Sequence, residues 1–152
     1  MPTAEKTRTA LHLRCSIRRD IVAPPERIWK LLTDAARFPS WNSTVTRIDG
    51  EIALGAKLAL RVPLDPKRTF HPKVTRLVAN REMEWRDGFA PMFRGIRTFA
   101  LTPGATGVTT FEMTETFSGL MLPMIAKSLP DFGPAFETYA ADLARAAEKE
   151  PR

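Results

Sequence analysis

The sequence predicts an α+β fold in which an antiparallel sheet of about seven strands is covered by a long C-terminal helix. Apolar residues recur at every second position in seven stretches, which is the pattern of half-buried strands. In the last stretch the spacing changes to three and four residues, which is the pattern of an amphipathic helix. A sheet with one apolar face needs a cover, and the final helix can supply it.

Length and composition indicate an ordinary globular domain. The chain has 152 residues, of which 43% are hydrophobic and 26% are charged, and a chain of this size buries roughly 70% of the surface that it exposes when unfolded. We expect a single domain over residues 10–150 and a flexible tail over residues 1–9. Most of the 13 prolines fall at joints between the periodic stretches.

The first strand and two short helices open the domain. Alternation over residues 11–22 predicts the strand, and Pro24 and Pro25 end it. A proline is favourable in the first turn of a helix, and we place the helix at residues 26–33. A second short helix, beginning at Asp34, is expected to end before Pro39.

Six further strands are predicted from residue 43 onward. They cover residues 43–52, 57–62, 69–78, 81–87, 93–101 and 108–117. The joints between them hold Gly, Pro, Asn and Asp, which are the turn residues expected between antiparallel neighbours. We therefore expect these six strands to follow one another as a meander.

The C-terminal segment predicts a short helix over residues 120–128 and a long helix over residues 131–148. Phe132, Phe136 and Leu143 are spaced to share one face of the long helix. Pro134 is compatible with the first turn of this helix but not with its middle.

Charge and cysteine content exclude several classes of function. The net charge is +6, but the basic residues alternate with apolar ones, and the densest pairs are Arg18–Arg19 and Lys67–Arg68. Phosphate binding needs positive charge concentrated on one face, so we expect a dispersed solvated surface and no nucleic-acid partner. The single cysteine, Cys15, excludes an internal disulfide and is expected to be a small buried side chain in a reducing compartment.

Motifs for targeting, metals and cofactors are missing from the sequence. The first ten residues hold no apolar signal region, and nowhere do about 18 apolar residues run together. We therefore expect a soluble, cytoplasmic protein without stable membrane insertion. His12 and His71 have no companion ligands at metal spacing, and no phosphate loop, dinucleotide fingerprint or nucleophile elbow occurs, so no metal and no cofactor are predicted.

Four short patterns carry a resemblance to a known superfamily. They are I-x-A-P-P-E-x-I-W-x-L-L-x-D, F-P-x-W-N, G-x-x-x-F-x-L and E-x-F-x-G. With the order of elements, they make residues 10–148 resemble the START and birch-allergen-like superfamily, also called SRPBCC, and within it the polyketide cyclase/dehydrase-like branch. The resemblance implies a helix-grip fold, in which a curved sheet wraps around the C-terminal helix and leaves a hydrophobic cavity open at one end.

Two charged residues are predicted to face that cavity. Alternation along the last hairpin puts Arg97 and Glu115 on its apolar side. A register in which Phe99 opposes Phe111 makes them diagonal neighbours that can pair, since burying either charge alone would cost several kcal/mol. The pair can orient a carbonyl or carboxylate of a ligand, or it can be a structural ion pair. An arginine neighbour is expected to lower the pKa of Glu115, which argues against a general acid.

The remaining candidate contacts are apolar. Aromatic and methionine side chains at these spacings adapt well to apolar ligands, but they also form ordinary cores. Trp41, in the corner at residues 38–41, is expected either to cover the cavity from the side or to fill the core. The predicted ligand contacts are Trp41, Leu58, Leu60, Met83, Trp85, Phe93, Arg97, Phe99, Phe111, Met113, Glu115, Met124, Phe132 and Phe136.

Three functions are compatible with these features. The first is binding of a small hydrophobic, lipid- or polyketide-like molecule by a monomer or homodimer. The second, implied by the resemblance, is a polyketide cyclase or dehydratase acting in the same cavity, with Glu115 and Arg97 as the catalytic candidates. The third is a protein-interaction or co-chaperone role, for which the sequence gives no exposed apolar patch.

Overall fold

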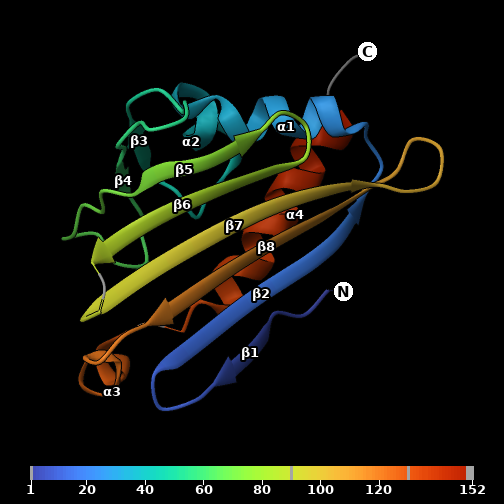
Figure 1. The fold of residues 1–152 in the computed structure, drawn as a ribbon. Coiled ribbons are helices and arrows are strands. Elements are labelled where there is room, and N and C mark those ends of the chain that lie inside the picture. Colours follow the sequence, from blue (N-terminus) through green and yellow to red (C-terminus); the bar gives the residue numbers. More distant parts are fainter. Residues whose placement is uncertain (1, 90, 130, 150–152) are drawn as a thin grey trace.

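The structure, a computed structural model, describes residues 2–89, 91–129 and 131–149. Its main sheet is antiparallel, with the strand order β1-β2-β8-β7-β6-β5 (Figure 1). These strands are β1 (Glu5–Arg8), β2 (His12–Ile21), β5 (Lys73–Val78), β6 (Glu82–Phe89), β7 (Phe93–Pro103) and β8 (Thr109–Ser118). A second sheet has two strands, β3 (Arg47–Asp49) and β4 (Ala59–Arg61).

The long helix α4 lies across one face of the main sheet (Figure 1). Helices α1 and α2 lie at the end of the sheet where α4 finishes, and α3 lies at the opposite end. The helices are α1 (Pro25–Thr33), α2 (Phe38–Trp41), α3 (Leu122–Ile125) and α4 (Gly133–Lys149), with 3-10 turns η1 (Ala35–Arg37) and η2 (Ala126–Ser128). This is the predicted α+β helix-grip fold.

The predicted six-strand meander is wrong in its first half. Only β5 to β8 follow one another as neighbours in the main sheet, whereas β3 and β4 pair separately. Two glycines adopt left-handed conformations: Gly50 at φ 107°, within the first expected strand, and Gly55 at φ 85°, in the connection to the second, where the observed strands are short. The segments next to the small sheet are linked to β5, because the Val74 N–H of β5 donates to the Ala56 carbonyl at 2.9 Å and Lys57 forms a bridge with Lys73.

Part of the segment expected to be a flexible tail forms the edge strand β1. Its four residues pair with β2 and are all exposed. The sequence Glu-Lys-Thr-Arg has no apolar side, so alternation could not reveal this strand. Two contacts with the C-terminal region hold it: the Ala4 N–H donates to Glu137 at 3.0 Å, and Lys6 donates to Asp131 at 2.9 Å.

Two helix boundaries also differ from expectation. Helix α2 does not end before Pro39 but contains it in its first turn, where the missing N–H costs no intrahelical hydrogen bond. Helix α4 begins at Gly133, slightly after its expected start, with Pro134 in the first turn.

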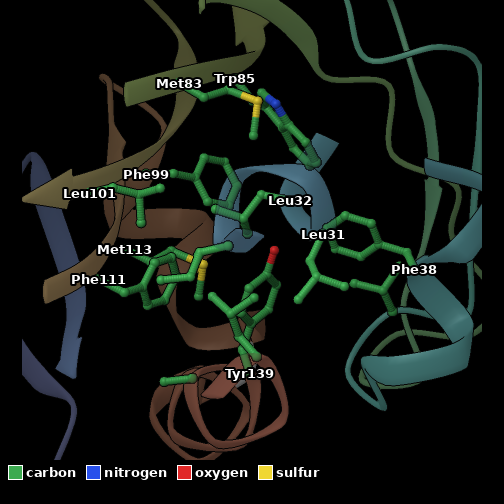
Figure 2. Packing of buried hydrophobic residues seen from close by; sticks show 14 of the residues in the cluster. Leu31, Leu32, Phe38, Met83, Trp85, Phe99, Leu101, Phe111, Met113 and Tyr139 are labelled. Carbon is green, nitrogen blue, oxygen red and sulfur yellow. The ribbon is translucent and has the colours of Figure 1, made fainter. Parts of the chain in front are cut away.

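The core lies between the inner face of the main sheet and α4 (Figure 2). On α4, Phe136, Tyr139, Leu143 and Ala147 are buried, and their spacing of three and four residues places them on one face. Burying a leucine- or phenylalanine-sized side chain stabilises a fold by about 1.5–3 kcal/mol. This row of buried side chains therefore holds α4 on the sheet and determines which residues of the helix face the strands.

Candidate functional site

The pairing of β7 with β8 places Arg97 directly opposite Glu115. The predicted register is therefore wrong, because Phe99 opposes Met113 instead of Phe111. Strand β7 continues to Pro103, and the loop at residues 104–108 is closed by a hydrogen bond of 2.9 Å from the Gly104 N–H to the Val108 carbonyl. Since the shift covers an even number of positions, every side chain keeps its face.

Arg97 and Glu115 form an ion pair on the inner face of the sheet. The Arg97 Nε donates to Glu115 Oε1 at 2.8 Å, and the two side chains are 17% and 12% exposed. The guanidinium also lies over the ring of Phe136 on α4, 5.2 Å from its centroid. Nε and Oε1 are the atoms that make the hydrogen bond of the pair. The pair thus places a cationic donor and an anionic acceptor on the inner face of the sheet.

Burial raises the pKa of the Glu115 carboxyl, and the negative charge of Asp87 raises it further, while Arg97 opposes both effects. The arginine does act to lower this pKa, as expected, but loss of solvation outweighs its attraction, so the net direction is upward and not downward. Asp87 lies on β6 opposite Gly95, on the same side of the sheet as Glu115. Asp87 is thus close enough for its negative charge to act on Glu115.

Gly95 makes room for the Glu115 carboxylate. It opposes Phe117 across the β7–β8 ladder. A Cβ atom at Gly95 would lie 3.3 Å from Glu115 Oε2 and 3.4 Å from the Phe117 ring. Sequence reasoning missed this position, although a glycine inside a strand is a signal of a close approach.

The ion pair belongs to a row of side chains that crosses five strands. Directly paired positions place Lys6, Cys15, Glu115, Arg97 and Trp85 side by side. Cys15 is buried, and burial raises the pKa of its thiol, in keeping with the expected small buried side chain. The indole N–H of Trp85 is buried and has no partner within the described residues.

Three phenylalanines form an aromatic stack beside the ion pair. The ring of Phe117 lies 5.8 Å from that of Phe93 and 5.3 Å from that of Phe132, and both contacts are stacked. All three side chains are partly exposed. Because Phe93 and Phe117 are on the inner face of the sheet and Phe132 precedes α4, the stack spans the space between them. This aromatic stack is the solvent-reachable part of the interior next to the ion pair.

Tyr139 lies at the centre of the core. Figure 2 shows its hydroxyl pointing away from α4 into the middle of the buried side chains. The residue is 2% exposed, and its hydroxyl has no partner among the described residues. Burial raises the pKa of Tyr139 well above its usual value of 10.0, so the hydroxyl keeps its proton. Rings within 6.4 Å of the Tyr139 ring centroid are those of Phe38, Trp41, Phe99 and Phe111.

Most of the predicted ligand contacts belong to the close-packed core. The members that are buried in one cluster are Leu58, Leu60, Met83, Trp85, Phe99, Phe111, Met113 and Phe136. Phe93 and Phe132 remain partly exposed at the aromatic stack. Met124 does not line the interior, because α3 leaves it 76% exposed. These placements divide the interior into a packed centre and a more accessible end.

Trp41 packs against the core and also borders the outside of the molecule. Its ring lies 4.8 Å from that of Phe38 and 6.0 Å from that of Tyr139, the latter edge-on. It also borders an outer groove of about 380 Å³ between α1, α2 and α4. The other residues lining this groove are Leu31, Arg37, Ser40, Asp142, Arg145, Ala146 and Lys149. Trp41 therefore separates the aromatic core from the groove.

Some large apolar side chains are exposed on the surface of the protein. Leu11, Met92, Leu120 and Met124 are 43%, 37%, 60% and 76% exposed. Their segments are joined by backbone hydrogen bonds, from Gly119 to Leu11 at 3.2 Å and from Met121 to Met92 at 2.9 Å. The β1–β2 connection lies at the same end of the sheet as α3 (Figure 1).

The part of the chain that the structure describes holds neither a cluster of metal-ligating side chains nor a membrane-spanning helix. No three or more His, Cys, Asp or Glu side chains there are arranged to hold a metal ion. None of its helices has both the length and the hydropathy needed to cross a membrane.

An antiparallel sheet packed against one long C-terminal helix defines a helix-grip protein with an SRPBCC-type fold. The chain belongs to the family described as polyketide cyclase / dehydrase and lipid transport, whose model matches residues 12–148. No curated protein matches the sequence.

Solved structures share this fold at low sequence identity. Truncated norcoclaurine synthase from Thalictrum flavum is 11% identical, with a TM-score of 0.71 over 95% of this chain and 99% of that one. CalU16 from Micromonospora echinospora is 15% identical, with a TM-score of 0.69 over 99% and 86% of the two chains. A START superfamily protein from Mycobacterium smegmatis is 17% identical, with a TM-score of 0.66 over 90% and 97%. At such identities the likeness shows the fold alone.

Proposed function

We propose that the protein binds a small hydrophobic molecule where the buried ion pair meets the aromatic stack. The observation that carries the proposal is the Arg97–Glu115 pair, an ion pair that is largely buried on the inner face of the sheet. A buried ion pair is usually no more stable than apolar residues of the same volume. Recognition of a polar group on a ligand gives such a pair a role that packing alone does not.

The apolar part of the ligand would lie against the rings of Phe93, Phe117 and Phe132. These rings face the interior, are stacked, and are still partly exposed, so they can be reached without first opening the core. The fully buried residues behind them, such as Phe99 and Met113, would support the site. Membership of a family described by lipid transport and polyketide chemistry supports this choice of ligand class.

The proposal is tested with an uncharged fluorescent dye that binds apolar sites. We expect Phe117→Ala to weaken dye binding by about tenfold or more, because one ring contributes about 1.5–3 kcal/mol when buried. The control is Val22→Ser, at a side chain that is 65% exposed on the connection to α1. Equal affinity of Phe117→Ala and the wild type would show that the dye site lies elsewhere and would remove the aromatic stack from the proposal.

A second candidate function is acid–base catalysis in the same site. The raised pKa of Glu115 favours it, because a general acid or base works best when its pKa is close to the operating pH. Once a substrate is found, Glu115→Gln should lower kcat by about a hundredfold or more while substrate still binds. Unchanged turnover would leave Glu115 with a binding role only.

A further inference from the structure

We propose that the outer groove between α1, α2 and α4 binds a small organic anion with a flat apolar part, such as an aromatic carboxylate. This groove is separate from the ion pair and the aromatic stack, so the proposal does not rest on the proposed function. The groove has a volume of about 380 Å³, which is at the lower end of the roughly 300–1,000 Å³ that small-molecule sites occupy. Two features support the proposal: the charges that line the groove, and the apolar surface among them.

Positive charge predominates along the groove. Among the described residues that line it, three are cationic and one is anionic, namely Arg37, Arg145, Lys149 and Asp142. The three cationic residues are exposed, so a ligand can reach them from solvent. The sign of this charge favours an anion and disfavours a cation.

The carboxylate of Asp142 is already engaged by the protein. Its side chain is 9% exposed, and Oδ2 accepts from the Ser43 N–H at 2.8 Å and from the Ser43 hydroxyl at 2.7 Å. Its Oδ1 accepts from the Arg145 Nη1 at 3.2 Å, while the Arg145 side chain is still 61% exposed. Asp142 therefore positions the guanidinium, and a positioned arginine loses less freedom when it binds a second carboxylate.

An apolar surface lies among the charged side chains of the groove. Trp41 lines it together with Leu31 and Ala146. The position of the indole is fixed from the core side, where its ring lies 4.8 Å from that of Phe38 and 6.0 Å from that of Tyr139. A rigid aromatic side chain offers contact area to a flat ring. An inorganic anion would leave this surface without a partner, so the groove fits an organic anion better.

The end of α4 does not reverse the sign of the charge. Asp142, Arg145, Ala146 and Lys149 are spaced by three and four residues and so share one face near the helix C-terminus. A helix C-terminus carries roughly half a negative charge, which is less than the full charges of the cationic side chains. In addition, the Arg27 Nη1 donates to the Ala147 carbonyl at 3.1 Å and so satisfies one of the last carbonyl groups of the helix.

The test compares naphthoate, its uncharged methyl ester and acetate at about pH 7, where carboxylic acids are ionised. Dissociation constants are taken from amide chemical-shift changes of Arg145 and Lys149 at low salt, so that binding in the groove is followed separately from binding in the interior. We expect naphthoate to bind at least about tenfold more tightly than either the ester or acetate. Equal affinity for the ester or for acetate would overturn the proposal, and so would the absence of a saturable change with naphthoate.

The variant Arg145→Ala assigns the anion to the cationic side chains. We expect it to weaken naphthoate binding by about tenfold, because a charge-assisted contact is lost. The matched control is Arg76→Ala on β5, since the Arg76 side chain is also 61% exposed and also paired with a carboxylate, that of Glu82. The control should bind naphthoate as the wild type does. Wild-type affinity in a folded Arg145→Ala would overturn the proposal.

If Arg145→Ala does not fold, as judged by circular dichroism, Lys149→Gln replaces it. Lys149 is exposed in the last turn of α4, and its loss should weaken naphthoate binding by about threefold or more. Unchanged affinity of this variant would overturn the proposal. Raising the salt concentration should weaken the binding of naphthoate and leave that of the ester unchanged, because salt screens exposed charges. An equal effect of salt on both ligands would likewise contradict an anion site.

Discussion

At the scale of single residues, the Arg97–Glu115 pair determines both the stability and the chemistry of the interior. Glu115→Ala should lower the free energy of unfolding by about 3 kcal/mol, because it leaves a largely buried guanidinium without its partner. The double replacement Arg97→Met with Glu115→Leu should cost much less, since no charge is then left alone. Urea denaturation of the three proteins measures both effects. A loss below about 0.5 kcal/mol for Glu115→Ala would mark the pair as effectively solvent-exposed.

The raised pKa of Glu115 leads to a pH dependence of known sign. A carboxyl whose pKa is higher in the folded protein holds its proton longer there than in the unfolded chain. The free energy of unfolding therefore falls as pH rises from the ordinary value of 4.5 toward the folded pKa. Glu115→Gln lacks this contribution. The free energy of unfolding of the wild type minus that of Glu115→Gln should thus decrease as pH rises above 4.5. An increase of this difference with pH would contradict a raised pKa of Glu115.

At the scale of elements, the tight β6–β7 connection depends on Gly88. Its φ is 81°, and a Cβ atom would lie 2.4 Å from the Phe93 carbonyl oxygen. Gly107 has nearly the same conformation, with φ 78°, but open space around it. Gly88→Ala should therefore destabilise the fold by at least about 1 kcal/mol more than Gly107→Ala, since both share the backbone strain and only the first adds a clash. Thermal unfolding compares the two variants, and equal losses would show that the hairpin adapts.

The elements that alternation predicted well are those with one buried face. Strands β2, β7 and β8 and helix α4 each show a clear apolar stripe, and each lies close to its predicted position. Strand β1 was missed because it has no buried side chain, and its pairing comes from backbone hydrogen bonds alone. The predicted β7–β8 register was wrong because the register depends on the length of the loop at residues 104–108. The pattern of apolar residues does not encode that length.

The same reasoning explains what could be predicted of the site. Alternation alone put Arg97 and Glu115 on the inner face, and the cost of burying a lone charge implied that they pair. The roles of Gly95 and Tyr139 depend on contacts between distant segments: the first faces Glu115 and Phe117, and the second has rings from α2, β7 and β8 around it. No local pattern contains that information.

At the scale of the whole molecule, the two ends of the interior differ. The end near α1 and α2 is closed by the aromatic core around Tyr139 and by Trp41, with the groove outside it. The other end carries the aromatic stack and the exposed side chains of Met92, Leu120 and Met124. A ligand that enters at this second end would meet the rings first and the ion pair deeper inside. The site and the groove are therefore distinct places that one experiment can separate.

Mapping amide chemical-shift changes during titration with an uncharged hydrophobic ligand tests the central claim most directly. The account predicts saturable changes at residues of the site, namely Phe93, Gly95, Arg97, Glu115, Phe117 and Phe132. Residues of the groove, such as Arg145 and Lys149, should stay unchanged. Changes confined to the groove, or no saturable change along β7 and β8, would contradict a ligand site between the sheet and α4.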